Sequence, residues 1–323
     1  MREHRYPIYI PSRGRATLCI TARRLDREGT PFHLVVEPQE AEAYRNVYGS
    51  DRVLVLPFRD QGSVTPARNW IKQHATEAGH ARHWQLDDNI YFAQRLYRGH
   101  RYHCRFAVAL AVCEDFTDRY DNIGVSGLNY AMFAVPANTY APYYLNVHVY
   151  SCTLILNALP YLWRPQYNED TDYCLQVLAG GLCTVLINAF VVKKVQTMTV
   201  RGGNMPIYQG DGRLRMARSL ERDWPGVVRV ERRFQRPQHV IANGWQKFDT
   251  PLRKRADLQL PAGPDEYGLV LQAHAAGSHG PEVRGPFVTG EPDQHVRTAR
   301  PAPIAAQQQR HLQPAARKRK GKA

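Results

Sequence analysis

Two neighbouring carboxylates and an amide follow a short apolar run in the first third of the chain. The segment reads His83-Trp84-Gln85-Leu86 and then Asp87-Asp88-Asn89. Adjacent carboxylates raise each other's pKa, so keeping both ionised is costly unless a cation lies beside them. Carboxylate and amide oxygens suit Mg²⁺ or Mn²⁺, which in turn bind diphosphates. The alternative is a solvated junction between a strand and a turn, where Asp and Asn bond their own backbone.

A second acidic cluster follows Asn168 and consists of Glu169, Asp170 and Asp172. Acidic residues in the first turn of a helix complement its dipole, and asparagine is a good N-cap, so a structural explanation exists. Three carboxylates within four positions nevertheless exceed what capping requires. One that faces a pocket can act as a general base when its neighbours shift its pKa.

Three arginines and a glycine pair are candidates for holding an anionic ligand. Arg13, Arg15 and Arg68 stand in predicted turns or in the first turn of a helix, where guanidinium and helix N–H groups can bind phosphate together. For any single arginine, an ordinary surface position is an equal alternative. The glycines of residues 197–204 allow close approach of the backbone to a ligand, or form a simple hairpin turn.

The first ninety residues alternate between short apolar runs and amphipathic segments. Predicted strands cover residues 8–10, 32–36, 53–56 and 84–88. Predicted helices cover residues 17–28, 37–48 and 65–79, the last with Thr65 as N-cap and Pro66 at the first helical position. This alternation predicts a mostly parallel sheet with right-handed crossovers. Ligands then lie at the carboxyl ends of the strands, where the arginines and Asp87 also fall.

The section after residue 90 has weaker patterns. Predicted helices cover residues 106–116, 169–179 (capped by Asn168) and 212–220, and predicted strands cover parts of 122–135, 146–156, 183–192 and 227–230. Neither G-x-G-x-x-G nor G-x-x-x-x-G-K-[ST] occurs, which disfavours a dinucleotide-binding Rossmann enzyme and a P-loop NTPase.

Composition favours a polyanionic partner. The 323 residues carry a formal net charge of +14, and 43% of them are hydrophobic, which is enough for a sizeable core. No apolar run reaches the ~20 residues of a membrane span, and the start of the chain lacks a signal-peptide pattern. Six cysteines without a C-x-x-C pair predict reduced thiols. We therefore expect a cytoplasmic protein with no membrane association.

The last part of the chain, residues 256–323, is dominated by proline, glycine, glutamine and arginine without apolar periodicity. We expect a disordered basic tail there. Its closing run, Arg317-Lys318-Arg319-Lys320, either keeps the protein soluble or binds phosphates without reading sequence.

Aromatic residues gather between residues 130 and 167. Core packing is the expected role of most of them. Tyr130, Tyr150 and Trp163, together with Asn129, are the candidates for stacking on or bonding a base that has been flipped out of a duplex.

Five segments taken together resemble the phage TET-associated glycosyltransferases, which are related to the kinetoplastid base J glucosyltransferase. The segments are Ile10-Pro11-Ser12-Arg13-Gly14-Arg15, Thr65-Pro66-Ala67-Arg68-Asn69-Trp70, Trp84-Gln85-Leu86-Asp87-Asp88-Asn89, Tyr167-Asn168-Glu169-Asp170-Thr171-Asp172 and Gly202-Gly203-Asn204. The resemblance covers roughly residues 6 to 250. It implies a GT-A-like α/β fold, with a Rossmann-type nucleotide-sugar-binding sheet and helices on both faces, over residues 1–255. Residues 1–90 form the nucleotide-binding half and 91–255 the acceptor-binding and catalytic half.

The resemblance implies a reaction and its partners. A sugar moves from a nucleotide-sugar donor to the hydroxymethyl group of a 5-hydroxymethyl-pyrimidine, foremost 5-hydroxymethylcytosine, in double-stranded DNA. A TET-like dioxygenase makes that group, a divalent metal (Mn or Mg) assists, and the pattern suggests inversion at the sugar.

The resemblance also assigns residues. The residues expected to bind the donor are Pro11, Ser12, Arg13, Arg15, Thr65, Arg68, Asn69, Asp87, Gly202, Gly203 and Asn204. The residues expected to bind the metal are Asp87, Asp88 and Asn89. They correspond to the D-x-D motif, although Asn89 replaces its second aspartate. His239 is a further candidate ligand. Asp170 is the expected base, flanked by Glu169 and Asp172. The candidates for contacting the acceptor base stay those named above from the aromatic cluster: Asn129, Tyr130, Tyr150 and Trp163.

Two other readings remain at this point. One is a GT-A enzyme that glycosylates a glycan, lipid or protein. The other is a non-catalytic DNA-binding module on a transferase fold, against which the retained carboxylates argue. The charge of +14 favours DNA as the partner.

Overall fold

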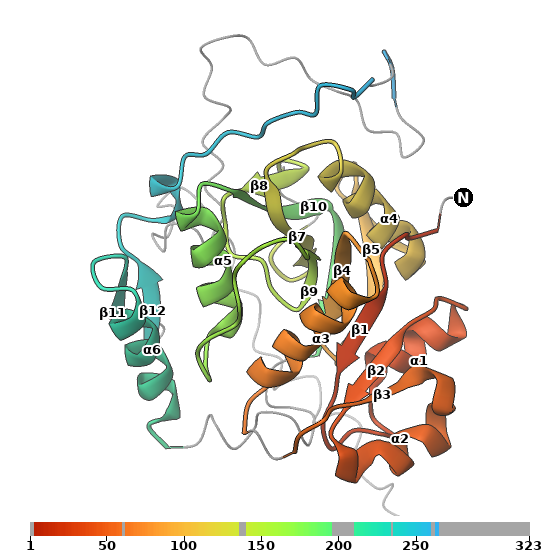
Figure 1. Cartoon of the computed structure of the whole chain (residues 1–323). Helices are drawn as coiled ribbons and strands as arrows, with labels where there is room; N and C mark the ends of the chain where they lie inside the picture. The colour runs from red at the N-terminus through yellow and green to blue at the C-terminus, as the bar shows by residue number, and fades with distance from the viewer. Residues whose placement is uncertain are drawn as a thin grey trace, which may run out of the picture.

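The computed structural model describes residues 3–59, 62–135, 140–195, 210–233, 235–259 and 262–264. Its described part is an α/β fold built on a ten-stranded mixed sheet with helices on both faces (Figure 1). The strand order is β3-β2-β1-β4-β9-β7-β10-β5-β6, with β8 beside β10. The α/β expectation is therefore confirmed.

The elements have the following bounds. The strands of the sheet are β1 (Ile8–Pro11), β2 (His33–Val36), β3 (Val53–Val55), β4 (Arg82–Leu86), β5 (Ile90–Tyr97), β6 (His100–Cys104), β7 (Ile123–Tyr130), β8 (Tyr143–Leu145), β9 (Cys152–Leu156) and β10 (Cys183–Lys194). The helices are α1 (Ile20–Arg27), α2 (Ala41–Tyr48), α3 (Thr65–Glu77), α4 (Phe106–Thr117), α5 (Glu169–Ala179) and α6 (Gly212–Asp223). A separate hairpin joins β11 (Val228–Arg233) to β12 (Arg236–Ile241), and short 3-10 turns are η1 (Pro38–Glu40), η2 (Ser50–Arg52) and η4 (Trp245–Lys247).

Strand direction divides the sheet into two parts. Strands β3, β2, β1 and β4 are parallel, as the alternation of the first ninety residues predicts. Beyond β4 the directions mix, because β9 runs antiparallel to both β4 and β7, whereas β10 is parallel to β7 and antiparallel to β5. The parallel part brings the carboxyl ends of β1 and β4 to one edge, where a ligand site is expected.

The two faces of the sheet are buried by different helices. On β1, Ile8 and Ile10 pack into the core with residues of α1, α2 and α4, whereas Tyr9 between them packs with α3. Alternate side chains of a strand point to opposite faces, so this pattern places α3 on the other side of the sheet. Helix α5 contacts β7 and β10 through a further buried cluster (Figure 1).

Of the two predicted helix caps, Thr65 is wrong and Asn168 is at the predicted N-cap position but makes no capping hydrogen bond with its side chain. Thr65 lies inside α3, whose N-cap is Val64, and the Thr65 hydroxyl donates instead to the Pro165 carbonyl at 2.6 Å. Asn168 precedes α5 in a left-handed conformation (φ 55°) without a capping bond, and its amide donates to the Met216 carbonyl at 2.7 Å. In both cases a tertiary partner takes the side chain that the local pattern assigns to the helix.

Two parts of the sheet differ from the predicted strands. Only the second half of the predicted strand at 146–156 is β9, since left-handed residues at Asn146 and Ser151 interrupt the preceding segment. The β5–β6 hairpin was not predicted, because its sequence is rich in arginine and histidine and its exposed edge shows no clean apolar alternation.

The chain beyond β12 returns to the turn between α4 and β7. The Arg253 amide donates to Asn122 Oδ1 at 2.8 Å, and the Arg255 amide donates to the Arg119 carbonyl. The predicted boundary near residue 255 stays a prediction, and most of the predicted tail (265–323) lies outside the described residues. Among the helices of the described ranges, none is long and apolar enough to cross a membrane.

Candidate active site

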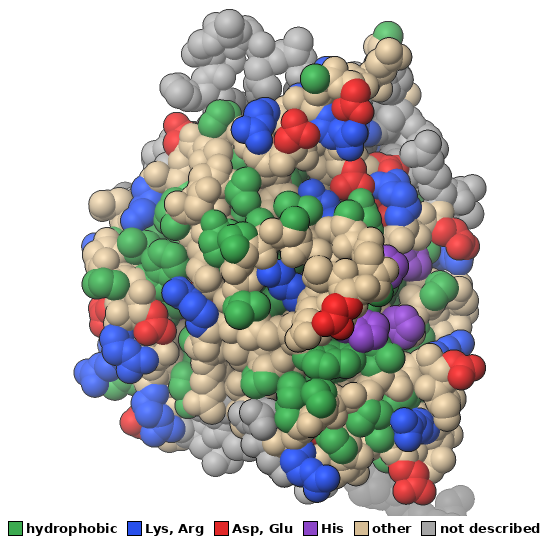
Figure 2. Space-filling view, in the orientation of Figure 1, with side chains coloured by type: hydrophobic (Ala, Val, Ile, Leu, Met, Phe, Trp, Pro, Cys, Tyr) green, Lys and Arg blue, Asp and Glu red, His purple; other side chains and the backbone are tan. Residues whose placement is uncertain are grey.

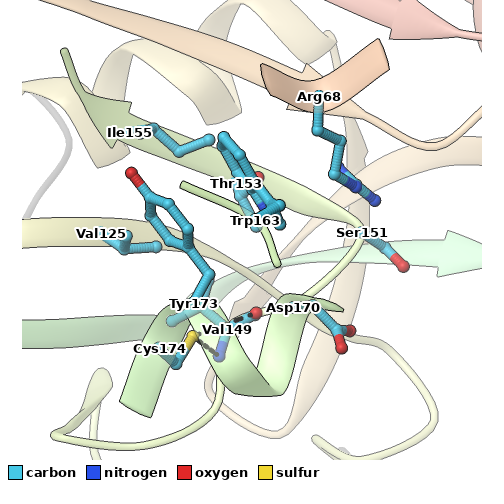
Figure 3. A pocket seen from close by; sticks show the side chains of 10 residues that line it. All are labelled: Arg68, Val125, Val149, Ser151, Thr153, Ile155, Trp163, Asp170, Tyr173 and Cys174. Carbon is cyan, nitrogen blue, oxygen red and sulfur yellow. Dashed lines mark hydrogen bonds between the residues drawn. The ribbon is translucent and has the colours of Figure 1, made fainter. Parts of the chain in front are cut away.

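The candidate site lies where β4 ends and where α3 and α5 begin. Asp87 and Asp88 follow β4, Arg68 stands in the first turn of α3, and Glu169 and Asp170 open α5. Figure 3 shows Arg68 and Asp170 projecting from these two helices, with Ser151 near the guanidinium. The convergence of residues from separate sequence regions at a sheet edge marks this as the chemical centre of the described structure.

Asp87 lies among cations. Its Oδ2 accepts hydrogen bonds from Lys194 Nζ and Ser151 Oγ, both at 2.6 Å, and its Oδ1 accepts one from Arg68 Nη2 at 3.3 Å. Burial raises the pKa of Asp87, but the charges of Lys194 and Arg68 outweigh this and hold the pKa below its usual value. Asp87 is therefore an ionised carboxylate that holds two cations in place.

Asp88 points elsewhere. Its Oδ2 accepts a hydrogen bond from Ser12 Oγ at 2.8 Å, and its Oδ1 forms an ion pair with Arg15. Its carbonyl accepts the amide of Ile20 at the start of α1. Burial raises the pKa of Asp88, although Arg15 opposes this shift. Asp88 thus joins the turn after β1 to the start of α1.

The two carboxylates do not converge on a common metal position. Asp87 faces Lys194 and Arg68, Asp88 faces Arg15, and no group of three or more His, Cys, Asp or Glu side chains with metal-binding geometry occurs among the described residues. Among the described residues, the Asn89 Oδ1 is buried without a hydrogen-bond partner, but this one oxygen alone is not a metal site. The predicted metal ligands therefore do not fit a metal in this arrangement.

His239 lies on β12 and is close enough to His148 and Asp170 to feel their charges. Burial and the charge of His148 together lower its pKa to about 4, and Asp170 opposes this shift. It is a neutral imidazole at physiological pH.

Arg68 links the two acidic clusters. Its Nη1 donates to Gln85 Oε1 at 3.0 Å, its Nη2 to Asp87, and its Nε lies 3.4 Å from Glu169 Oε1. The side chain is only 6% exposed, yet Nε has no hydrogen bond of good geometry within the described structure. A guanidinium fixed in this way still has a donor to offer to a ligand.

Glu169 and Asp170 are neighbours with opposite pKa shifts. Burial and the charge of Asp170 together raise the pKa of Glu169 to about 7, against the opposing charge of Arg68. Burial also raises the pKa of Asp170, but His148, whose Nε2 lies 3.2 Å from Asp170 Oδ2, and Arg68 reverse the effect and hold it below the usual value. At neutral pH Asp170 is the ionised carboxylate of the pair, and it is also the more exposed, at 31% against 16%.

Asp172 is not brought to the site. Its carboxylate is fully buried and accepts hydrogen bonds from Trp224 Nε1 at 2.7 Å, Gln176 Nε2 at 2.8 Å and Arg164 Nε at 3.2 Å. These partners come from the end of α6, from the next turn of α5 and from the loop before α5, respectively Trp224, Gln176 and Arg164. Asp172 therefore links α5 to the end of α6 and to the loop before α5, whereas the sequence prediction grouped it with the catalytic residues.

The predicted donor residues divide into two groups. Ser12, Arg15, Arg68 and Asp87 contact one another or share partners at the site. Thr65 and Asn69 instead hold the loop before α5, since both amide atoms of Asn69 bond the Trp163 backbone.

Of the five further predicted donor residues, two stand at or just after β1 and three lie outside the described residues. Pro11 ends β1, and Arg13 is exposed in the turn that follows it. Gly202, Gly203 and Asn204 lie outside the described residues.

The predicted acceptor residues divide in the same way. The Tyr130 hydroxyl lies 3.3 Å from Lys194 Nζ and belongs to the Asp87 network. Tyr150 donates to Asn129 Oδ1 at 2.6 Å, and its ring lies 4.5 Å from that of Tyr130. Trp163 stacks on Tyr173 (4.0 Å between ring centroids) within the core and lines the small cavity next to Arg68 and Asp170.

A small cavity lies behind the charged residues. It is lined by ten side chains and measures about 10 Å³, which is space for one water molecule. Figure 3 shows Arg68 and Asp170 at one side of it and the Tyr173 ring directed the other way. The cavity is too small for a nucleotide or a base.

Three residues of the site were not predicted: His148, Ser151 and Lys194. Lys194 ends β10, two residues beyond the predicted strand at 183–192. Ser151 adopts φ 59°, which costs a non-glycine residue energy and is frequent at functional sites, but this conformation is visible only in the structure. The sequence itself carries no signal for Ser151 or His148.

Comparison with known proteins adds a family. A family model described as TET-Associated Glycosyltransferase matches residues 6–203. Among solved structures, the chain is similar to the mannose-1-phosphate geranyltransferase from Thermus thermophilus, with 15% identity and a TM-score of 0.27. That match covers 57% of this chain and 57% of the other, so the chain spans little more than half of that protein. No curated protein matches.

The first prediction concerns Asp172. We expect Asp172→Asn to lower the free energy of unfolding by about 1–3 kcal/mol, because the buried charge that Arg164 and Trp224 bond is lost. Urea unfolding measures the change. The matched control is Asp257→Asn, whose exposed pair with Arg255 contributes little. Equal stability of the two variants would contradict the structural role of Asp172.

The second prediction concerns Glu169. Its pKa is about 7 in the folded protein and near 4.5 when unfolded, so the folded state binds more protons between these values. The free energy of unfolding therefore falls as pH rises through this window, by about 1–3 kcal/mol. Glu169→Gln lacks this loss, and its stability relative to wild type should rise from pH 5 to pH 8. Urea unfolding at several pH values tests this, with exposed Glu77→Gln as control. A difference that does not change with pH would show that Glu169 titrates normally.

Proposed function

Because the chain belongs to the TET-associated glycosyltransferase family, whose model spans residues 6–203, we propose that it glycosylates hydroxymethylated pyrimidines in double-stranded DNA, foremost 5-hydroxymethylcytosine, from a nucleotide-sugar donor. The observation that supports this most is the meeting of Arg68 with Asp87 on one side and Glu169–Asp170 on the other. Cations suited to a diphosphate thus lie within one group of residues with an ionised carboxylate suited to be a base.

The proposed reaction is a single displacement. The hydroxymethyl oxygen attacks the anomeric carbon as Asp170 takes its proton, and the bond from that carbon to the diphosphate oxygen breaks, so the electron pair leaves with the diphosphate. Attack opposite the leaving group inverts the sugar. A hydroxymethyl group ionises far above neutral pH, so a positioned base contributes ~10²–10⁴ in rate. His148, paired to Asp170 Oδ2 at 3.2 Å, orients the carboxylate.

DNA as acceptor is supported by the β5–β6 hairpin. No acidic residue occurs between Asp88 and Glu114, a stretch that contains four arginines and two histidines over residues 95–105. Tyr97 and Tyr102 are 41% and 52% exposed, and the guanidinium of Arg95 lies 4.6 Å from the Tyr97 ring centroid. Arginine and tyrosine on an exposed sheet edge suit a phosphate backbone.

The hairpin is also connected to the site. Arg101 on β6 donates to the carbonyls of Ala131 and Ala134, in the segment that directly follows Tyr130. By contrast, Figure 2 shows Lys and Arg side chains interspersed with Asp and Glu over the described part of the face in view. The hairpin, whose sequence has no acidic residue, is therefore the DNA-contacting surface that we propose.

The third prediction is the reaction itself. Full-length protein, incubated with 5-hydroxymethylcytosine DNA and a panel of nucleotide sugars, should yield a nucleoside heavier by one sugar on mass spectrometry of the digested DNA. Asp170→Asn should lower kcat by ~10²–10⁴, whereas Asp257→Asn should not.

Turnover by Asp170→Asn close to wild type would remove Asp170 as base. Release of nucleoside diphosphate without a mass shift, on either hydroxymethylcytosine or hydroxymethyluracil DNA, would instead indicate a different acceptor.

The fourth prediction concerns DNA affinity. We expect Arg95→Ser with Arg98→Ser to weaken binding to duplex DNA and to reduce the slope of log Kd against log salt by about 1–2, because up to two phosphate contacts are lost. Fluorescence anisotropy over a salt series measures both. The control, Arg27→Ser with Arg45→Ser, makes the same charge change on exposed positions of α1 and α2. An equal effect of the two double variants would show that only net charge matters.

A further inference from the structure

Lys194 is a largely buried lysine of the site with three hydrogen-bond partners. Its Nζ donates to Asp87 Oδ2 at 2.6 Å, Ser151 Oγ at 2.9 Å and the Tyr130 hydroxyl at 3.3 Å, and its side chain is 16% exposed. The next amide, of Val195, donates to the Asn89 carbonyl and fixes the end of β10 against the turn after β4. Long surface lysines are rarely held in this way.

The arrangement supplies the charge that a divalent ion would supply. Lys194 and Arg68 carry two positive charges and Asp87 carries one negative charge, which leaves a net charge of +1. A divalent cation on Asp87 alone would give the same net charge. The Asp87 oxygens accept three hydrogen bonds from Lys194, Arg68 and Ser151, so a metal here would have to displace a cation that is already buried.

We propose that Lys194 and Arg68 bind the diphosphate of the donor and stabilise it as the leaving group, with Asp87 as the residue that positions both cations and with no requirement for a divalent metal. This inference rests on the proposed function for its substrate. When the bond between the anomeric carbon and the diphosphate oxygen breaks, the electron pair stays on that oxygen. The ammonium and guanidinium groups stabilise the new charge through charge-assisted hydrogen bonds, without giving up a proton.

Two features concern how a ligand meets these cations. Arg68 Nε is buried 3.4 Å from Glu169 Oε1 and makes no hydrogen bond of good geometry in the described part of the chain, so its donor is not fully used. Asp87 is 25% exposed, more than Lys194 or Arg68, so the cluster opens toward solvent at the carboxylate they share. An incoming diphosphate can therefore replace Asp87 as the partner of one cation without a rearrangement of the strands.

The test uses inorganic pyrophosphate and Mn²⁺ as separate probes of the full-length protein. By titration calorimetry in excess EDTA, wild type should bind pyrophosphate. Lys194→Met should bind it at least about tenfold more weakly, the loss expected for one charge-assisted contact. Lys194→Arg should retain most of the affinity. Lys193→Met is the matched control, because Lys193 is the exposed neighbour whose Nζ lies over the Phe92 ring.

Electron paramagnetic resonance of Mn²⁺ gives an arm that needs no variant to fold. Wild type should show no saturable Mn²⁺ binding. Such binding, or pyrophosphate binding that appears only with Mn²⁺ or not at all, would overturn the inference, as would wild-type affinity in Lys194→Met. Neither probe involves an acceptor. Loss of DNA glycosylation with pyrophosphate binding intact would therefore refute the proposed function alone.

Discussion

The buried ion pairs of Asp87 with Lys194 and Arg68 are the constraint on which the site depends. They join the end of β4, the end of β10 and the first turn of α3, which are far apart in the sequence. A buried charge left without any partner costs about 3–5 kcal/mol, so each member of this group stays paired until another ion takes the place of its partner. The positions of three elements around the ligand site are thus coupled through one carboxylate.

The same logic explains why the acidic start of α5 is divided. Successive residues of a helix are about 100° apart, so residues two positions apart face nearly opposite directions. Asp170 faces the site, whereas Asp172 faces Trp224 and Arg164 on the other side of α5. Three acids that look equivalent in the sequence therefore become one accessible carboxylate, one with a raised pKa beside Arg68, and one structural anchor.

Much of the fold followed from local patterns. The parallel half with β1 to β4, helix α4 and helix α5 all have short-range signals, and residues at the predicted strand ends, such as Arg68 and Asp87, do lie together. Lys194 and Ser151 were missed because their position depends on the pairing of β10 and β9 with distant strands, which no local window contains. The roles of Thr65 and Asn69 were missed for the same reason, since the loop they hold lies far along the chain, at Trp163 and Pro165.

The metal site expected from two adjacent aspartates shows why sequence proximity alone does not place two side chains on one ligand. Along an extended segment, adjacent side chains point to opposite sides, so two consecutive aspartates at the end of a strand tend to diverge. Here they do: Asp88 joins the turn after β1 through Ser12 and Arg15, and Asp87 holds the cations. A carboxylate pair that diverges cannot chelate one ion. The charge problem that it poses is solved separately for each member, by Arg15 for Asp88 and by Arg68 with Lys194 for Asp87.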